Sequence, residues 1–385
     1  MLIAGEASGD LLAAELVSAL REACALNPQA EFRNPQFLGA GGAKMTEAGV
    51  ELAFDMTQHA ATGIPTLGRF FQGRKQFNQL FALAVERRPD AVIGVDYGFF
   101  NLRFGHAIKQ FVRDNPFSKW SPKLIQFVSP QVWASRPGRA KLLEADYDLL
   151  LSIFPFEKDW YAKRVPKLRV EFVGHPMVER FEKFKVQGFK FKDSAAPTVL
   201  LLPGSRKGEL KQHLPVMLDA VELIQKKLPA CRVQMVLPDP ALKKLAEKLS
   251  VPPPAVEIQA GTLPQALAQA DVVISKTGTV TMECAFFGVP TVTLYKKPLL
   301  GLALSLGIIT VKSLTMPNLL AGGEVFPEFL QKDATPENIA QAALELLENE
   351  SRRQEIKSQL EKIVVSLGEP GASRRAATAI LGLFK

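Results

Sequence analysis

An aspartate in the first half of the sequence stands where a general base would be useful. Asp96 follows directly on the apolar run 91–95 and precedes Tyr97 and two phenylalanines. Contact with aromatic surface removes water from a carboxylate and raises its proton affinity, which favours proton abstraction from a hydroxyl. An aspartate at this place could equally cap a following helix, so the segment alone leaves both interpretations open.

A glycine-containing loop follows the first apolar run and carries three polar side chains. It reads Gly5-Glu6-Ala7-Ser8-Gly9-Asp10 and leads into an amphipathic helical pattern. Backbone N–H groups in such a loop can hold a phosphate or a sugar hydroxyl, and Glu6, Ser8 and Asp10 would stand beside it. The alternative is that Ser8 or Asp10 only caps the helix.

Two loops in the second half of the sequence could together bind a diphosphate. Leu202-Pro203-Gly204-Ser205-Arg206 follows one apolar run, and Ser275-Lys276-Thr277-Gly278-Thr279 follows another. Each motif is weak alone. Together they offer glycine and hydroxyl-rich turns and an arginine, Arg206, whose guanidinium can pair with phosphate oxygens.

The second of these loops leads into a short helical pattern that carries an acid. Gly278 and Thr279 form the turn, and Glu283 lies one turn inside the helix. There it could accept hydrogen bonds from ribose hydroxyls. The alternative is a glutamate that stabilises the helix N-terminus.

The other titratable residues argue against a metal centre. No metal-ligand spacing occurs among the histidines and cysteines, which are His59, His106, His175, His213, Cys24, Cys231 and Cys284. The cysteines also suggest no disulfide framework and therefore a reducing compartment. Asp146-Tyr147-Asp148 resembles the paired aspartates of metal-dependent sugar transferases, but it precedes its apolar run. We interpret it as structural, because it would lie at the sheet edge opposite the ligands.

Short apolar runs must position these side chains. The runs alternate with longer helical patterns, which is typical of an α/β protein with buried parallel strands. They cover residues 2–4, 91–95, 124–128, 149–153 and 170–173, and then 198–202, 233–237, 256–259, 271–275 and 291–294. In open parallel sheets ligands bind beyond the carboxyl ends of the strands, so we expect the polar clusters to gather there.

The length of 385 residues predicts two domains. The boundary falls in a segment where lysines alternate with phenylalanines and no clear helical period appears. We expect Rossmann-like domains at 1–180 and 198–368, a linker at 181–197, and a C-terminal helix at 369–385 that packs back on the first domain. Two such halves would face each other across a ligand-binding cleft.

Composition excludes several classes of protein. With 47% hydrophobic and 22% charged residues, the chain is neither disordered nor collagen-like. Residues 1–60 carry three Lys/Arg against eight Asp/Glu, whereas residues 61–240 carry 29 against 17. This basic excess suits nucleic acid, anionic lipid and phosphorylated substrates equally well. We expect no nucleic-acid partner, because zinc-finger spacing, an aromatic RNA-binding run and a compact arginine tract are all missing from the sequence.

The sequence predicts contact with a membrane surface, without a span or a secretory leader. The longest uncharged apolar stretch, 298–311, is too short to cross a bilayer, and acids occupy the place of a leader. Residues 63–85 read as an amphipathic helix with a broad apolar side and Arg74 within it. We expect this helix to dock on the anionic membrane. The alternative is that it packs against the N-terminal sheet.

Taken in order, these motifs resemble the lipid-A-disaccharide synthase family of inverting GT-B glycosyltransferases. The resemblance runs nearly end to end. The segments that carry it are 4–10, 94–96 with Asn101, 128–130 with 132–134, 154–158, 174–175, 202–206, 278–279 with 283–284, and Met316-Pro317-Asn318-Leu319-Leu320-Ala321-Gly322.

The resemblance implies the reaction and the roles of individual residues. A 2,3-diacylglucosamine unit would pass from UDP-2,3-diacylglucosamine to the 6-hydroxyl of 2,3-diacylglucosamine 1-phosphate, with release of UDP and no cofactor or metal. Asp96 would be the base. The nucleotide sugar would contact Arg206, Gly278, Thr279, Glu283 and Asn318, while Glu6, Ser8 and Asp10 would line the acceptor side. The resemblance also favours a homodimer on the cytoplasmic face of the inner membrane.

Three positions depart from the pattern of the family. Phe99 replaces a second acid, Ser135 replaces a second tryptophan, and Lys276 replaces a small residue. The first departure puts in doubt a mechanism that needs two acids in this loop. The alternatives are another UDP-sugar enzyme of the same architecture, such as a peptidoglycan glycosyltransferase or a UDP-N-acetylglucosamine 2-epimerase, and a non-catalytic nucleotide-sugar sensor.

Overall fold

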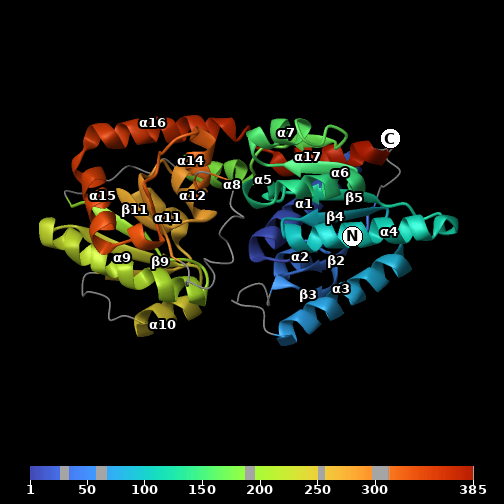
Figure 1. Cartoon of the computed structure of the whole chain (residues 1–385), viewed down its shortest axis with the longest axis horizontal. Helices are drawn as coiled ribbons and strands as arrows, with labels where there is room; N and C mark the ends of the chain where they lie inside the picture. The colour runs from blue at the N-terminus through green and yellow to red at the C-terminus, as the bar shows by residue number, and fades with distance from the viewer. Residues whose placement is uncertain are drawn as a thin grey trace. The chain divides into compact units, whose positions relative to one another are not determined.

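The chain divides into two compact units (Figure 1). The computed structural model describes residues 1–26, 34–57, 67–186, 196–249, 256–296, 311 and 313–384, and for residues 67–71 and 183–186 it describes the backbone alone. Unit 1 contains Met1–Glu179 together with Leu367–Lys385, and unit 2 contains Arg180–Ser366.

Unit 1 is built on a parallel sheet that, within the described residues, has seven strands in the order β3-β2-β1-β4-β5-β6-β7. The strands are β1 Leu2–Ala4, β2 Leu38–Gly41, β3 Glu51–Asp55, β4 Ala91–Val95, β5 Lys123–Phe127, β6 Leu149–Ser152 and β7 Val170–Phe172. The sequence predicted β1 and β4 to β7 within one or two residues. It missed β2 and β3.

The helices of unit 1 cover this sheet. They are α1 Ala7–Leu26, α2 Ala43–Glu47, α3 Leu67–Arg87, α4 Gly98–Asp114, α5 Val132–Ser135, α6 Ala140–Asp146, α7 Pro155–Ala162 and α17 Ala372–Leu381, with 3₁₀ turns η2 Pro116–Ser118, η3 Pro137–Arg139 and η5 Gly382–Phe384. Ile3 belongs to a core cluster that includes buried residues of α3, α4 and α6, while Leu2 and Ala4 are buried outside that cluster. This alternation is expected of a strand covered on both faces.

Unit 2 holds the second parallel sheet, with six strands among the described residues in the order β10-β9-β8-β11-β12-β13. The strands are β8 Thr198–Leu202, β9 Arg232–Leu237, β10 Val256–Ala260, β11 Val272–Lys276, β12 Thr291–Tyr295 and β13 Glu328–Leu330. The helices are α9 Lys207–Lys227, α10 Pro240–Leu249, α11 Leu263–Gln269, α12 Val280–Phe286, α14 Met316–Ala321, α15 Pro336–Glu348 and α16 Glu350–Ser366, with the 3₁₀ turn η4 Gln331–Asp333. The predicted second series of strands is confirmed, and β13 was missed.

Helix α8, Pro176–Val186, occupies the first part of the segment that we expected to be a linker. Phe181 is buried, and its ring lies 5.5 Å from the rings of Phe286 and Phe287. Residues 187–195 lie outside the described part of the chain. The end of the chain returns to unit 1, where α17 packs on α1 (Figure 1).

Helix α3 corrects part of the membrane expectation. Leu80 and Ala84 are fully buried, and Phe77 and Phe81 make edge contacts with the Phe104 ring of α4. Its C-terminal half therefore belongs to the core, as the alternative interpretation held. Arg74, which we placed on the apolar side, is exposed. Residues 63–66 and the side chains of residues 67–71, including Phe70 and Phe71, lie outside the description.

Within the described residues, no helix is both long and apolar enough to cross a membrane.

Each sheet has a point where the strand order reverses. In unit 1 the chain passes from β1 through β2 and β3 on one side of β1 and then returns to the other side with β4. In unit 2 it passes from β8 through β9 and β10 and returns to the other side of β8 with β11. Ligands of open α/β sheets bind beyond the carboxyl ends of the strands at such points. The polar loops identified in the sequence follow β1 and β4 in unit 1, and β8 and β11 in unit 2.

Candidate active site

The backbone around Asp96 is held in an unusual conformation. Asp96 and Tyr97 have φ angles of 51° and 44°, in the left-handed region that non-glycine residues rarely adopt. The Asp96 N–H donates to the Phe127 carbonyl at 2.9 Å, which extends the β4–β5 pairing by one residue. Such strained turns persist only where their surroundings fix them, and they cluster at functional sites.

Two buried amides fix this turn. Asn101 Nδ2 and Gln126 Nε2 both donate to the Asp96 carbonyl oxygen, at 2.8 and 2.9 Å. Gln126 Nε2 also reaches the carbonyl of Val128 at 3.1 Å, and Val128 is itself left-handed with φ 66°. Gly94 makes room for these amides, since a Cβ there would lie 2.6 Å from Gln126 Oε1. The sequence reasoning missed Gln126, although a glutamine inside an apolar run was a usable signal.

The Asp96 carboxyl lies beside the first glycine loop. Burial raises its pKa above the ordinary value, and the nearby charge of Glu6 raises it further. Hydrogen bonds from the Tyr97 N–H and the Ser8 hydroxyl act in the opposite direction. The structure therefore brings Asp96, Glu6 and Ser8 together, and the carboxylate has an increased affinity for a proton.

Gly5 is required for close packing in this loop. A Cβ on Gly5 would lie 2.4 Å from atoms of the Tyr97 ring, so the ring rests directly on the glycine. Burial raises the pKa of Tyr97, and Glu6 adds to the shift. The tyrosine stacks on Phe100 with a centroid distance of 5.7 Å and forms one wall beside Asp96.

Asp10, which we expected on the acceptor side, is hydrogen-bonded to the backbone at the start of α2. It is 4% exposed, and its carboxylate accepts hydrogen bonds from the backbone N–H groups of Gly42, Lys44 and Met45 at 2.7 to 3.1 Å. These groups open α2. Asp10 therefore caps α2 and joins it to α1, and its carboxylate is taken up by those contacts.

Phe99, at the position of the missing second acid, is 59% exposed. The guanidinium carbons of Arg103 and Arg139 lie 5.7 and 5.3 Å from the centroid of its ring. Neither arginine forms an ion pair with a carboxylate within the described residues. Burial and the charge of Arg136 lower the pKa of Arg139. A cationic and aromatic surface thus adjoins the Asp96 turn.

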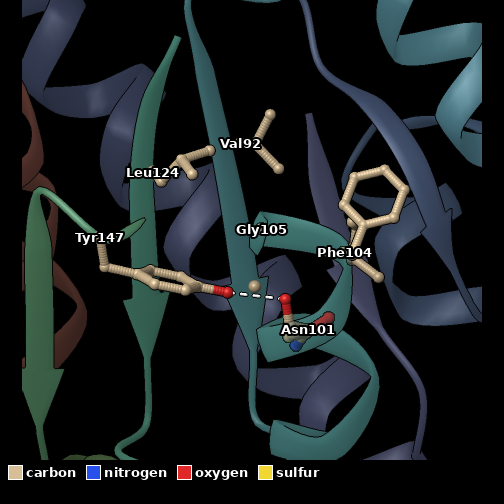
Figure 2. A pocket seen from close by; sticks show the side chains of 8 residues that line it. Val92, Asn101, Phe104, Gly105, Leu124 and Tyr147 are labelled. Carbon is tan, nitrogen blue, oxygen red and sulfur yellow. Dashed lines mark hydrogen bonds between the residues drawn. The ribbon is translucent and has the colours of Figure 1, made fainter. Parts of the chain in front are cut away.

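The interpretation of Asp146-Tyr147-Asp148 as structural agrees with its contacts. Asp146 is 2% exposed and lies 2.8 Å from His106 Nδ1, while Asp148 accepts from the Leu124 N–H at 2.8 Å. The Tyr147 hydroxyl donates to the Asn101 carbonyl at 2.7 Å, beside Gly105 (Figure 2). Tyr147 thereby supports the helix that carries the Asn101 amide.

Unit 2 contains a cavity of about 330 Å³ at the switch point of its sheet. The part of its lining that we call the apolar wall includes Val236, Leu237, Pro238, Leu263 and Pro264. The part that we call the polar wall follows β8 and β11 and includes Gly204, Ser205, Glu209, Lys276, Gly278, Thr279 and Glu283. A cavity with one apolar and one polar wall suits a ligand that combines a flat base with hydroxyl and phosphate groups.

Glu283 has the electrostatics of a site residue. Burial raises its pKa to about 7, against the opposing charge of Arg180. A carboxyl with a pKa in this range is accessible in both protonation states, so it can either donate a hydrogen bond to a ligand hydroxyl or accept one from it. Arg206 is exposed and stands at the N-cap of α9, three residues before the cavity acid Glu209, and it does not itself line the cavity.

Asn318 lies outside this cavity and is committed to a loop. Its Oδ1 accepts from the N–H groups of Val325 and Phe326 at 2.9 and 2.8 Å, and its Nδ2 donates to the Phe326 carbonyl at 2.8 Å. Nδ2 also reaches Glu328 Oε1 at 3.1 Å. Buried at 3% exposure, Asn318 organises the chain that leads to β13.

We therefore expect Asn318→Ala to lower the stability of the protein and to have little direct effect on ligand binding. Two buried N–H groups would lose their acceptor, and the free energy of unfolding should fall by about 2–4 kcal/mol. Chemical denaturation together with UDP titration below the transition provides the test. A variant with unchanged stability and lost UDP affinity would show that Asn318 contacts the donor after all.

No group of three or more His, Cys, Asp or Glu side chains positioned to hold a metal ion occurs among the described residues. Cys24, Cys231 and Cys284 are free and buried.

Comparison with known proteins identifies the family. The family model for lipid-A-disaccharide synthetase matches residues 1–382. The chain belongs to the lipid-A-disaccharide synthase family. It is 34% identical to the lipid-A-disaccharide synthase of Syntrophus aciditrophicus over 401 residues, covering 100% of this chain and 97% of that relative. A synthase from Coxiella burnetii is also 34% identical, over 395 residues, covering 100% of this chain and 98% of the relative.

Solved structures support the fold. The S. aureus MnaA–UDP co-structure has a TM-score of 0.64 at 15% identity and covers 100% of this chain and 96% of its own. MurG of Acinetobacter baumannii has a TM-score of 0.55 at 15% identity, covering 99% of this chain and 98% of its own. At this identity the likeness shows the GT-B fold alone. The synthase is thus a GT-B glycosyltransferase of lipid A biosynthesis, as the sequence resemblance implied.

Proposed function

We propose that this synthase transfers 2,3-diacylglucosamine from UDP-2,3-diacylglucosamine to the 6-hydroxyl of 2,3-diacylglucosamine 1-phosphate, with inversion at the anomeric carbon. The observation that carries the proposal is the Asp96 carboxylate. It has a raised pKa, it lies at the switch point of the first sheet, and it shares its surroundings with Glu6 and Ser8.

In the proposed reaction Asp96 removes the proton of the acceptor hydroxyl. At the same time the oxygen of that hydroxyl attacks the anomeric carbon of the donor. The bond from that carbon to the diphosphate oxygen breaks, and UDP leaves with the electron pair. A base with a raised pKa takes the proton more readily, which favours the transfer at neutral pH. Asn101 and Gln126 fix the strained backbone of the turn from which the Asp96 carboxylate projects.

The cavity of unit 2 supports a nucleotide-sugar site. Its apolar wall would contact the uracil ring, and Glu283 would bind ribose hydroxyls. Gly278 and Thr279 offer donors to the diphosphate, and Arg206 adds positive charge nearby. Cationic side chains would then stabilise the charge that develops on the leaving group, without a metal ion.

We also propose that the enzyme works on the anionic cytoplasmic face of the inner membrane, where acylated substrates would reside. The supporting features are basic residues of unit 1, namely the exposed Arg74 and Lys75 of α3 and the Phe99 surface with the exposed Arg103 and the half-buried Arg139. An aromatic ring flanked by arginines suits an interface of acyl chains and phosphate headgroups.

The Phe99 surface gives a test of membrane contact. Replacing Arg103 and Arg139 by Gln should lower the affinity for anionic vesicles, measured by co-sedimentation, by roughly thirtyfold. Each basic residue near such a surface contributes about 1 kcal/mol to binding. The matched control replaces the exposed Lys226 and Lys227 of unit 2 by Gln. Equal losses in both variants would indicate unspecific charge attraction, and no loss would exclude this surface as the contact.

The reaction is tested with both acylated substrates, with mass analysis of the product and measurement of UDP release. We expect a β-1,6 disaccharide 1-phosphate and one UDP per product, with activity that survives EDTA. Turnover of UDP-N-acetylglucosamine without an acceptor would instead indicate a 2-epimerase. Binding of UDP without any transfer would indicate a nucleotide-sugar sensor.

A further inference from the structure

The polar wall of the unit 2 cavity contains an ion pair that the proposed function leaves without a role. Lys276 is the last residue of β11, and Glu209 lies in the first turn of α9. The Lys276 Nζ is 2.9 Å from Glu209 Oε1, and the two side chains are only 17% and 18% exposed. Both line the cavity.

Glu209 is fixed as a carboxylate. Burial alone would raise its pKa, but the charge and hydrogen bond of Lys276, the Ser205 N–H and the charge of Arg206 together hold the pKa below its ordinary value. The Ser205 N–H donates to Oε2 at 3.0 Å. Oε2 of Glu209 thus keeps a backbone hydrogen bond even if Lys276 leaves Oε1.

The ammonium of Lys276 stands over the turn that carries the expected diphosphate donors. A Cβ built on Gly278 would lie 3.1 Å from Nζ, so the absence of a side chain at this glycine leaves the ammonium open to the turn. Lysine has three N–H donors, and Glu209 Oε1 accounts for one of them. The remaining donors can serve a ligand in the cavity.

The His213 ring near Lys276 adds no positive charge to the cavity. His213 is 1% exposed, and burial is the main cause of its lowered pKa. Its Nε2 accepts the Lys296 N–H at 3.1 Å, so the neutral ring donates from Nδ1 to the Pro203 carbonyl at 3.3 Å. Among the described residues that line this cavity, Lys276 has the one cationic side chain.

We propose that Lys276 binds the diphosphate of the nucleotide sugar and of the leaving UDP, with Glu209 as the internal counterion that holds the ammonium in place. The inference rests on the proposed nucleotide-sugar site and assigns its phosphate-binding cation to a residue that departs from the family pattern. A diphosphate oxygen would take the free donors of Nζ. As the bond to the sugar breaks, the ammonium would stabilise the charge that grows on the diphosphate.

The test is calorimetric titration with UDP and with uridine. Lys276→Met should weaken UDP binding by about tenfold to a hundredfold, because one charge-assisted hydrogen bond is lost. Uridine, which lacks phosphates, should bind both proteins equally. The matched control is Lys207→Met, which removes the same charge from an exposed position of α9 outside the cavity and should leave UDP affinity nearly unchanged.

Variants of Glu209 separate ligand binding from a purely structural ion pair. Glu209→Gln keeps an acceptor for the Ser205 N–H but removes the counterion that holds the ammonium in place, so UDP affinity should fall, though by less than in Lys276→Met. Adding Lys276→Met to Glu209→Gln removes the risk of an unpaired buried charge, and this double variant should still lose affinity. If the ion pair of Lys276 serves only to stabilise the packing of α9 on β11, Lys276→Met will lower the free energy of unfolding and leave UDP affinity unchanged.

The outcomes also separate this inference from the proposed function. If the wild-type protein and the Lys276→Met variant bind UDP equally tightly, the role of Lys276 is overturned and the proposed donor site is not. A wild-type protein that does not bind UDP at all overturns the donor site itself. Equal weakening of UDP and uridine would mean that the substitution collapses the cavity, which also contradicts a specific phosphate contact.

Discussion

Asp96→Asn should reduce sugar transfer by about a hundredfold to ten-thousandfold while UDP affinity stays unchanged, because the amide cannot accept the proton of the acceptor hydroxyl. The measurement is the rate of disaccharide formation at saturating substrates, beside calorimetric binding of UDP. Asp114→Asn, at the exposed end of α4, is the matched control and should retain full activity. Near wild-type turnover of a folded Asp96→Asn protein would remove Asp96 from the mechanism.

The raised pKa of Asp96 gives two further expectations. Activity should fall as the pH drops through that pKa, because the protonated carboxyl cannot act as a base. Glu6→Gln should move this acid limb to lower pH, since Glu6 contributes to raising the pKa of Asp96. A limb that stays in place in the variant would show that another group controls it.

The raised pKa of Asp96 also predicts the direction in which Asp96→Asn changes the free energy of unfolding. A carboxyl whose pKa is raised on folding binds its proton more tightly in the native state. The stability that this provides is complete below the unfolded pKa and is lost as the pH rises through the folded pKa. At pH 8 the ionised Asp96 therefore costs stability, and the Asn variant should be at least as stable as the wild type. A loss of activity with lower stability at pH 8 would have to be attributed to misfolding.

The strands could be predicted where apolar runs end in polar loops, whereas β2 was missed because its glycines obscure the apolar pattern. β2 reads Leu38-Gly-Ala-Gly41, and glycine is depleted in strands because it has no side chain to pack. Gly39 is nevertheless necessary, since a Cβ there would lie 1.8 Å from the Leu2 carbonyl oxygen of the paired strand. That requirement comes from a neighbour 37 residues away in the sequence, and no local pattern shows it.

Some of the predicted site residues are hydrogen-bonded to backbone groups that the local sequence pattern does not show. Asp96 and Glu283 follow their own strands, so their surroundings could be inferred from strand ends. Asp10 and Asn318 look identical to ligand-binding residues in the sequence, because polar side chains in loops suit either use. Their backbone partners, at Gly42 and Phe326, are brought to them only by the fold.

Helix α3 shows why an apolar stripe alone cannot distinguish core from membrane. The stripe is required in both cases, because a helix on a sheet and a helix on a bilayer each bury one side. The decisive fact is contact with a partner element. The rings of Phe77 and Phe81 pack on Phe104, and Leu80 is fully buried.

Arg206→Ala should weaken UDP binding by about tenfold while acceptor binding stays unchanged, because its guanidinium is expected to pair with the diphosphate. The structure limits the size of this effect. Arg206 is exposed at the N-cap of α9, where water and salt screen its charge, while Lys276 lies inside the cavity. UDP titration at low and high salt is the test, with the adjacent Lys207→Ala as the control for net charge.

The combination of Arg206→Ala with Lys276→Met makes this prediction quantitative. If both cations bind the same diphosphate, the loss of affinity in the double variant should differ from the product of the two single losses, because each cation changes the field in which the other acts. Salt should reduce the Arg206 contribution more than that of the half-enclosed Lys276. Unchanged UDP affinity in Arg206→Ala at every salt concentration would show that Arg206 points away from the nucleotide, and that the leaving diphosphate depends on Lys276 and the Gly278–Thr279 turn.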